Sequence, residues 1–317
     1  MNEPTQWIER SDRFRLRIEG PDRHKFLHNL TTNEIKRLPE NAGCETFVTS
    51  PQGKILAFVQ VHNLGDALLL RGDAAARETL MPHLAKYGMF DEITLNDLTE
   101  TTAEFHVFDD GASPDDSTAV PTPAEYSLAP MPSNAEFLVH AIHESPTGRP
   151  GVTFIVPRER AAVQRKHFEF QGYTGATAEL FDALRILAGT PVFGRDITTE
   201  NLPQEVGRDA RAISFVKGCY LGQETVARID ALGHVNKILR GFRFSAPEGV
   251  APGVALGKDG KPVGAITSTS VDPRNGRTVG MGYVRVQYAD AGTTLDVLSD
   301  PPGTTAMVSE FPILEIG

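Results

Sequence analysis

The sequence has few cysteines and no long apolar run. Only two of its 317 residues are cysteine, Cys44 and Cys219, and they form neither a CxxC pair nor a disulfide framework. The amino terminus lacks the basic and apolar regions of a secretory signal, and no apolar run approaches the ~20 residues that a membrane-spanning helix needs. These absences predict a cytoplasmic protein in a reducing compartment, with no disulfide and no membrane partner.

Basic residues are fewer than acidic residues. Lys and Arg number 31 against 41 Asp and Glu, which gives a net charge of −10. Such a field repels phosphate backbones, so we expect no direct nucleic-acid partner. Apolar residues make up 40% of the chain, enough for packed cores, and this excludes a disordered or fibrous protein. The length predicts two or three domains.

Several common site motifs are missing. The chain has no GxxxxGK[ST] phosphate loop and no GxSxG nucleophile elbow. His24 and His28 are four residues apart on a predicted helix and could share a metal ion, but no third ligand is evident. A solvated helix face explains this pair better, and we therefore predict no metal site.

The apolar pattern predicts a mixed α+β chain that becomes all-β towards its end. Strands are predicted over 14–18, 44–50, 54–64, 67–72, 92–98, 137–142 and 152–156, and helices over 22–30, 73–87, 157–170 and 177–188. Residues 109–134 are rich in Pro, Ser and Asp and are typical of an exposed excursion or linker. From residue 238 onwards, short β-rich segments separated by Asp-Gly and Asn-Gly turns predict a small barrel or sandwich.

The stretch 217–224, KGCYLGQE, places a cysteine between two glycines and just before a predicted helix over 223–232. Both the helix N-terminus and the nearby Lys217 favour the thiolate form of Cys219. A thiolate can act as a nucleophile, a redox centre or a metal ligand. The alternative is a small packed thiol, with the glycines serving only the turn. Cys44, at the start of a strand, is predicted to be structural.

Acidic residues gather in the stretch 195–209, where a predicted loop presents Glu205. A carboxylate can accept two adjacent N–H groups from the edge of a heterocycle, although an ordinary surface acid fits this residue type equally well. Arg185, on the preceding helix, is open to the same two interpretations. Glu224 and Arg228 are four residues apart on a helix and can form an exposed pair.

Four segments together carry a resemblance. They are KFLHNLTTNEI near the start, LRILAGTPVFGRDITTENLPQEVG, KGCYLGQE followed by ARIDALGHVNK, and VGMGYVRVQYADAGTTL near the end. In these segments the chain resembles the folate-binding YgfZ-type proteins, relatives of the glycine cleavage T-protein. The octapeptide is specific, because T-proteins have a different residue at the position of the cysteine. The segments span nearly the whole chain.

The resemblance implies an α+β fold of two intertwined ferredoxin-like subdomains plus a C-terminal antiparallel β-barrel. These parts would surround a central channel that holds tetrahydrofolate or another reduced folate. Residues 1–237 would form the folate-binding region, divided near residue 100, and 238–317 the barrel. Glu205 matches the glutamate that holds the pterin ring in T-proteins, and Cys219 matches the functional cysteine of YgfZ-type proteins. The same segments supply further expected folate contacts: Arg185, Lys217, Tyr220 and Arg228.

The resemblance also implies a function. YgfZ-type proteins support iron–sulfur enzymes, including a radical methylthiolase that modifies tRNA, and assist cluster assembly or repair in a folate-dependent way. Iron–sulfur client enzymes or assembly proteins are therefore the expected partners. Cys219 would face either the cofactor channel or a sulfur- or iron-bearing partner.

Two departures from the T-protein pattern bear on catalysis. Ala57 and Phe58 stand where T-proteins carry paired aspartates, one of them the catalytic acid, so aminomethyl transfer lacks an evident general acid or base. Leu187 stands where both groups usually have glutamate. We therefore expect an accessory protein that binds folate without turnover. A folate-dependent aminomethyl or one-carbon transferase, and a scaffold that keeps the fold without the ligand, stay open as alternatives.

Overall fold

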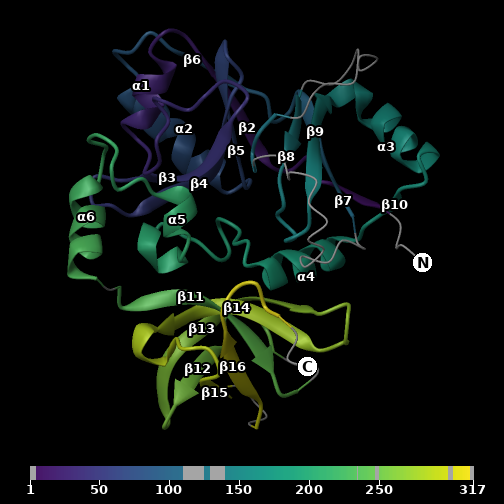
Figure 1. Cartoon of the computed structure of the whole chain (residues 1–317), viewed down its shortest axis with the longest axis vertical. Helices are drawn as coiled ribbons and strands as arrows, with labels where there is room; N and C mark the ends of the chain where they lie inside the picture. Colours follow the sequence, from purple (N-terminus) through teal and green to yellow (C-terminus); the bar gives the residue numbers. More distant parts are fainter. Residues whose placement is uncertain are drawn as a thin grey trace.

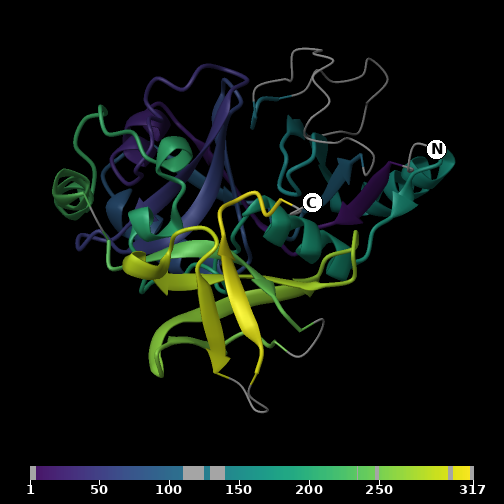
Figure 2. The same cartoon turned by 60° about the horizontal axis from the view of Figure 1, so that its bottom comes forward.

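Two sheets with their helices lie side by side, and a closed barrel lies against one end of both (Figure 1). Figure 2, with the barrel turned forward, shows the same arrangement. The computed structural model describes residues 5–109, 125–128, 140–233, 235–246, 250–298 and 303–314. The predicted fold class, α+β with a C-terminal antiparallel barrel, is confirmed.

The first sheet is built almost entirely from one continuous stretch of chain. Its strand order is β3-β4-β5-β2-β6. The strands are β2 (Phe14–Glu19), β3 (Gly43–Thr49), β4 (Ile55–Asn63), β5 (Ala67–Gly72) and β6 (Thr94–Asp97). Helices α1 (Arg23–His28) and α2 (Ala76–Tyr87) complete this unit. Every strand and helix predicted between residues 14 and 98 is confirmed, with boundaries that differ by a few residues.

The second sheet has the order β10-β1-β7-β9-β8 and intertwines the two units. Its strands are β1 (Gln6–Glu9), β7 (Thr102–Phe108), β8 (His140–His143), β9 (Gly151–Pro157) and β10 (Thr174–Gly175), with helices η1 (Arg158–Arg160), α3 (Ala161–Phe170) and α4 (Ala178–Ala188). The chain starts in this sheet, builds the first sheet, and then returns. Strands β1, β7 and β10 were not predicted. Most of the predicted linker at 109–134 lies outside the described residues.

A short irregular stretch leads from α4 to the barrel. It contains η2 (Pro203–Val206), α5 (Asp209–Ala212) and α6 (Gln223–Leu232), of which α6 has its predicted bounds. The barrel strands are β11 (Lys237–Phe244), β12 (Ala255–Lys258), β13 (Lys261–Val271), β14 (Thr278–Arg285), β15 (Thr294–Leu298) and β16 (Thr305–Ser309), with η3 (Val286–Tyr288). Strand β11 pairs with both β14 and β16, which closes the barrel. No helix in the described ranges is long and apolar enough to cross a membrane.

One apolar core joins the barrel to the first unit. Barrel residues Leu239, Met281 and Tyr283 belong to the same buried cluster as Phe47 of the first sheet and Leu184 of α4. The interior of the barrel forms a second cluster around Phe242 and Leu256. The barrel is therefore packed against the first unit and α4.

Buried ionic contacts join the two sheets. Arg71 of β5 is fully buried and forms two bidentate pairs, with Glu104 of β7 at 2.7 and 3.1 Å and with Glu144 at 3.0 and 3.0 Å. Burial raises the pKa of Glu104, but the charge and hydrogen bonds of Arg71 outweigh this and lower it to about 2. Both carboxylates are therefore ionised at neutral pH, and the ion pairs are complete.

The alternation of apolar and charged residues over 14–18 is typical of a half-buried strand. Its charged Arg15 is nevertheless fully buried. The Arg15 guanidinium donates to the hydroxyl of Thr102 and to backbone carbonyls, including that of Thr99 at 2.8 Å, and lies 3.7 Å from Glu104. Arg15 therefore meets buried acceptors and a carboxylate instead of water, which offsets the cost of its burial.

We predict that Arg71→Met lowers the free energy of unfolding by about 3–5 kcal/mol, because it removes the bidentate partner of two buried carboxylates, Glu104 and Glu144, and leaves Glu104 only its contacts with Arg13 and Arg15. Urea denaturation at pH 7 measures the change. The matched control is Arg77→Met, which removes a more exposed pair with Asp97 and should cost about 1 kcal/mol or less. Similar small losses in both variants would contradict a structural role for the Arg71 pairs.

Candidate functional site

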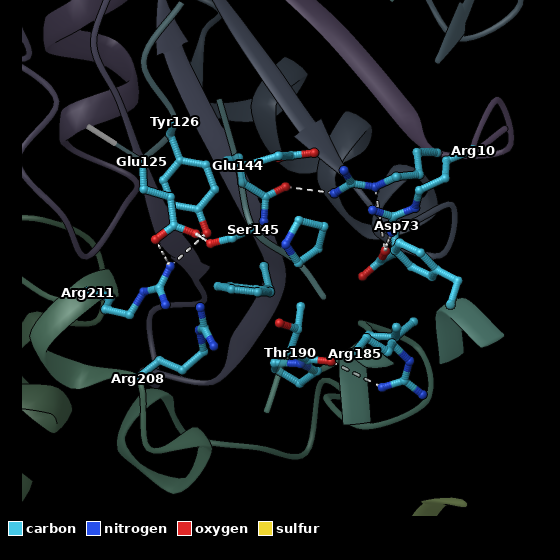
Figure 3. Close-up of a pocket in the computed structure, with 17 residues that line it drawn as sticks. Arg10, Asp73, Glu125, Tyr126, Glu144, Ser145, Arg185, Thr190, Arg208 and Arg211 are labelled. Carbon is cyan, nitrogen blue, oxygen red and sulfur yellow. Dashed lines mark hydrogen bonds and ion pairs between the residues drawn. The ribbon is translucent and has the colours of Figure 1, made fainter. Parts of the chain in front are cut away.

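An arginine-rich pocket lies between the two sheets (Figure 3). We call it the central pocket, and its volume is about 40 Å³. The residues that line it include Arg10, Arg13, Phe58, Asp73, Glu125, Tyr126, Glu144, Phe181, Arg185, Thr190, Arg208 and Arg211. A cavity of this size holds one or a few water molecules and no ring system. A larger ligand therefore requires movement of the lining side chains.

The carboxylates that line the central pocket are all engaged. Asp73 accepts a hydrogen bond from the backbone N–H of Phe193 and lies 3.7 Å from the Arg13 guanidinium. Glu144 is held by Arg71, and Glu125 is paired with Arg211. Burial raises the pKa of Glu144, but the charge and hydrogen bonds of Arg71 hold it well below its usual range. Among the described lining residues, no unpaired carboxylate is available for proton transfer.

The two residues at the position of the T-protein aspartates are apolar in fact as well as in sequence. Ala57 is fully buried in the core, and Phe58 lines the central pocket. The guanidinium of Arg208 lies 5.8 Å from the centre of the Phe58 ring and makes a bidentate pair with Glu45 at 2.6 and 2.7 Å. This part of the pocket offers an aromatic face beside a cation and no acid or base.

A larger depression adjoins the central pocket. We call it the outer groove, and its volume is about 620 Å³. It shares six lining residues with the central pocket, which are Arg10, Arg13, Asp73, Phe181, Arg185 and Val192. The guanidinium of Arg10 lies 4.5 Å from the centre of the Phe181 ring. Together the two spaces form a channel between the sheets, open at the outer groove.

Arg185, a predicted folate contact, lines both spaces but is fully engaged by protein groups. Its guanidinium pairs with Asp196 at 2.8 Å and donates to the Ser268 hydroxyl on β13 at 2.9 Å. It also donates to the Thr190 carbonyl at 3.1 Å. These contacts tie α4 to the barrel. Arg185 therefore positions the wall of the channel.

Glu205, predicted to hold the pterin ring, does not line the central pocket. Its Oε2 accepts hydrogen bonds from the Asn201 side chain at 3.1 Å and from the backbone N–H of Leu202 at 3.2 Å. Lys237, at the start of the barrel, lies 3.8 Å away. Glu205 is thus at the junction between η2 and the barrel.

Lys217 fixes the loop that carries Cys219. Its Nζ donates to three backbone carbonyls at 2.6–2.7 Å, those of His28, Thr31 and Asn33 at the end of α1. The three acceptors match the three N–H donors of an ammonium group, while burial lowers the pKa of Lys217 to about 7. Lys217 was predicted to favour the thiolate and to contact folate, and neither prediction included this anchoring role.

The two glycines of the octapeptide differ in their constraints. Gly222 caps the N-terminus of α6 with φ +83°, and a Cβ there would lie 2.4 Å from the Ser50 carbonyl oxygen. A side chain at Gly218 would make only an ordinary contact with His28. Gly222 is therefore required by the turn and by its close packing against the hairpin of the first sheet.

Cys219 is exposed and lies in a separate depression. We call this the cysteine groove. Its volume is about 500 Å³, and its lining includes Phe26, Asn29, Leu30, Tyr87, Asp91, Tyr220 and Leu221. Cys219 does not line either part of the channel. Its predicted orientation towards a partner stays a prediction.

The other two predicted contacts also lie outside the channel. Tyr220 is buried beside Lys217, whose Nζ lies 4.9 Å from the centre of the Tyr220 ring, and burial raises the pKa of Tyr220 to about 12. Arg228 is exposed on α6. The structure thus brings Cys219, Lys217 and Tyr220 together and leaves Arg228, Arg185 and Glu205 in other places.

Sequence reasoning missed the arginines of the channel. Arg208 and Arg211 are three residues apart on the short α5 stretch, directly after the acidic loop. That spacing is a weak pattern by itself. Arg10 and Arg13 lie in and beside a turn between strands, where arginines are ordinarily solvent-exposed. No group of His, Cys, Asp and Glu suited to a metal was found in the described part of the chain.

Comparisons with known proteins agree with this architecture. Residues 237–313 match the glycine cleavage T-protein C-terminal barrel domain. A crystal structure of the glycine cleavage system aminomethyltransferase T from Bartonella henselae superposes with a TM-score of 0.85, at 17% identity, over 99% of this chain and 87% of that one. This likeness concerns the fold.

Similar sequences carry several kinds of name, aminomethyltransferase among them. A putative chloroplastic transferase of Arabidopsis thaliana is 29% identical over 95% of this chain and 69% of its own length. The tRNA-modifying protein YgfZ of Hamiltonella defensa is 30% identical over 70% of this chain and 65% of its own. The human mitochondrial iron-sulfur cluster assembly factor IBA57 is 29% identical over 76% of this chain and 68% of its own length. The chain thus spans about two thirds of each relative's length.

We predict that iodoacetamide at pH 8 alkylates Cys219 and spares Cys44 in the folded protein. Cys219 is exposed, whereas Cys44 is half-buried and burial raises its pKa to about 12, so that it stays a protonated thiol. Mass spectrometry of tryptic peptides should find one label in the native protein and two in urea. Comparable native labelling of Cys44 would contradict the burial of its thiol.

Proposed function

Because this chain is a YgfZ-type relative of the glycine cleavage T-protein, we propose that it is a folate-binding accessory factor for iron–sulfur proteins. In this proposal the channel between the sheets holds tetrahydrofolate or another reduced folate, and Cys219 faces a partner. The protein supports cluster assembly or repair and, through a client enzyme, tRNA methylthiolation. It performs no turnover of its own.

The observation that carries the folate part of the proposal is the channel itself. Phe58 and Phe181 offer flat apolar surfaces, and each has an arginine guanidinium near its ring. A reduced folate combines a flat bicyclic ring with an anionic tail, and aromatic faces beside cations suit both parts. The outer groove supplies volume that the central pocket lacks. The residues present therefore fit the group.

The absence of turnover rests on the charges of the channel. Aminomethyl transfer needs a group that moves a proton at the folate nitrogen. Ala57 and Phe58 cannot do this, and the lining carboxylates Asp73, Glu125 and Glu144 are paired with arginines or an amide. The alternative, an aminomethyl or one-carbon transferase, is favoured by the fold and by the similar sequences that are named as transferases or aminomethyltransferases.

The partner surface in this proposal centres on the cysteine groove. Phe90, three residues after the groove residue Tyr87, is 95% exposed. Val216, three residues before Cys219, is 96% exposed. Large exposed apolar side chains beside an accessible thiol favour contact with another protein. Iron–sulfur client enzymes or assembly proteins are the partners that we propose. A nucleophile, a redox group and an iron ligand are the roles open to the thiol in that contact.

The net charge of −10 disfavours direct binding of tRNA, so any link to RNA runs through a client. The cytoplasmic location expected from the sequence stays a prediction. Two of the similar proteins are named as chloroplastic and mitochondrial.

We predict that tetrahydrofolate binds in the micromolar range, about −8 kcal/mol, in an anaerobic calorimetric titration. Thr190→Trp should weaken binding at least about tenfold, because the indole competes with the ligand for the space that movement of the lining side chains opens, and the substitution removes no charged group. The matched control is Thr199→Trp, an exposed position outside the channel, which should bind like wild type. No binding by wild type would exclude the folate proposal and leave the scaffold hypothesis.

The same experiment extends to two further measurements, a titration of Glu205→Ala and an assay for reaction products. Loss of binding in Glu205→Ala would support a direct role in holding the pterin, whereas retained binding would confine the ligand to the channel. Formation of methylene-tetrahydrofolate and ammonia from an aminomethylated lipoyl carrier would overturn the argument from Ala57 and Phe58. We expect neither product.

We predict that Cys219→Ala fails to restore iron–sulfur enzyme activities in cells that lack the protein. Its exposed thiol is the group offered to partners, so activity should stay at the level of the deficient strain. Cys44→Ala is the matched control and should restore activity, provided that both variants accumulate equally. Full restoration by Cys219→Ala would remove the thiol from the proposed function.

A further inference from the structure

A short segment, Glu125–Leu128, crosses one end of the central pocket, and we call it the strap (Figure 3). Backbone hydrogen bonds hold it at both ends. The Tyr126 N–H donates to the His143 carbonyl at 2.7 Å, and the Leu128 N–H donates to the Asn41 carbonyl at 2.9 Å. The strap is therefore attached to β8 of the second sheet and to the chain that leads into β3 of the first.

Side chains of the strap occupy the arginine end of the pocket. The Tyr126 hydroxyl donates to Glu45 at 2.8 Å and accepts from Arg211 at 3.2 Å. Glu125 forms a short ion pair with Arg211 and accepts from the Ser145 hydroxyl at 3.1 Å. The protein thus places its own carboxylate on Arg211 and its own aromatic ring beside it.

The strap is held in a backbone conformation that its residue type disfavours. Tyr126 has φ +65°, a region that side chains other than glycine rarely adopt. The His62 ring donates from Nδ1 to the Tyr126 carbonyl at 2.9 Å. A Cβ at Gly43 would lie 2.4 Å from the Tyr126 carbonyl oxygen and 2.7 Å from its Cβ. The His143 N–H also donates to the Ser127 carbonyl at 2.9 Å. The strap therefore depends on its pairing with β8, on His62 and on the missing side chain at Gly43.

From this geometry we infer that the strap is a displaceable plug. It fills one end of the central pocket with Glu125 and Tyr126, and a ligand with a flat ring and an anionic group must displace it. With the strap in place, the pocket volume of about 40 Å³ admits only water. When the strap leaves, Arg211 loses Glu125 and gains a site for the anionic group of the ligand. Only the identity of that ligand as a reduced folate rests on the proposed function. The inference that the strap can be displaced rests on the geometry described above.

Two variants release the strap by different means. Gly43→Ala places a methyl group against the Tyr126 backbone and 2.7 Å from the His62 Nδ1 that donates to the strap, and it removes no charged group. Glu125→Gln weakens the contact with Arg211 and leaves the backbone intact. The matched control is Asp97→Asn, which weakens an arginine pair of similar exposure, that of Asp97 with Arg77, at a distance from the pocket.

Hydrogen exchange of the full chain, measured by mass spectrometry on peptides that cover 125–128, tests the plug without any ligand. We expect exchange of the Tyr126 and Leu128 amides to be at least about tenfold faster in both variants and unchanged in the control. Unchanged amide exchange in the barrel strands would confirm that the variants are folded. Wild-type exchange rates at the strap in both variants would overturn the inference.

Titration of the same proteins with tetrahydrofolate tests whether the plug opposes the ligand. If the strap must leave before tetrahydrofolate binds, the apparent dissociation constant of each variant falls below that of wild type. The expected factor is about the factor by which the variant increases the population of the open state, in which the strap has left the pocket. Faster exchange with unchanged affinity, in proteins that bind tetrahydrofolate, would overturn ligand displacement. If wild type and variants all fail to bind it, the proposed function fails, and the exchange result alone decides whether the strap is a displaceable plug.

Discussion

The pairing of Arg71 with Glu104 and Glu144 is the constraint on which the channel depends. An arginine and two carboxylates removed from water would be very costly if any one of them lacked its partner, so the three side chains must stay together. Arg71 belongs to the first sheet and the two carboxylates to the second unit. Their bidentate geometry fixes both the distance and the relative orientation of the sheets. The central pocket is the space left beside this bridge.

This bridge also shapes the chemistry of the pocket. A channel lined by arginines must either expose them to a ligand or pair them with the protein's own carboxylates. Here Asp73, Glu125 and Glu144 are all paired, so the carboxylates neutralise the walls and cannot move protons. An apolar Phe58 at the position of a catalytic acid agrees with this arrangement. The pocket is therefore better suited to recognition than to turnover.

The local pattern of the sequence predicted most of the first sheet and most of the barrel. Alternating apolar residues and Asp-Gly or Asn-Gly turns are local features, and they specify hairpins wherever the neighbours in space are also neighbours in sequence. Strands β1 and β10 could not be found in this way, because they are short and pair with distant segments. The burial of Arg15 could not be predicted, because alternation does not reveal that a charged side chain of a strand meets buried acceptors instead of water. The arginines of the channel come from separate parts of the chain, and no pattern in the sequence indicated that they would lie close together.

Lys217 illustrates why the site itself was only partly predictable. Its place two residues before Cys219 suggested an effect on the thiol, whereas its three hydrogen bonds go to the chain after α1. One of those acceptors is the carbonyl of Asn33, and the Asn33 side chain donates in turn to the Arg211 carbonyl at 2.8 Å. The pocket arginine and the loop of the exposed thiol are thus fastened to the same residue. Since the segment from Arg211 to Cys219 is short and held there by Asn33, the position of the thiol loop and the arginine end of the channel are set by one set of contacts. That shared anchor gives a physical reason for one short stretch of sequence to contribute to two separate surfaces.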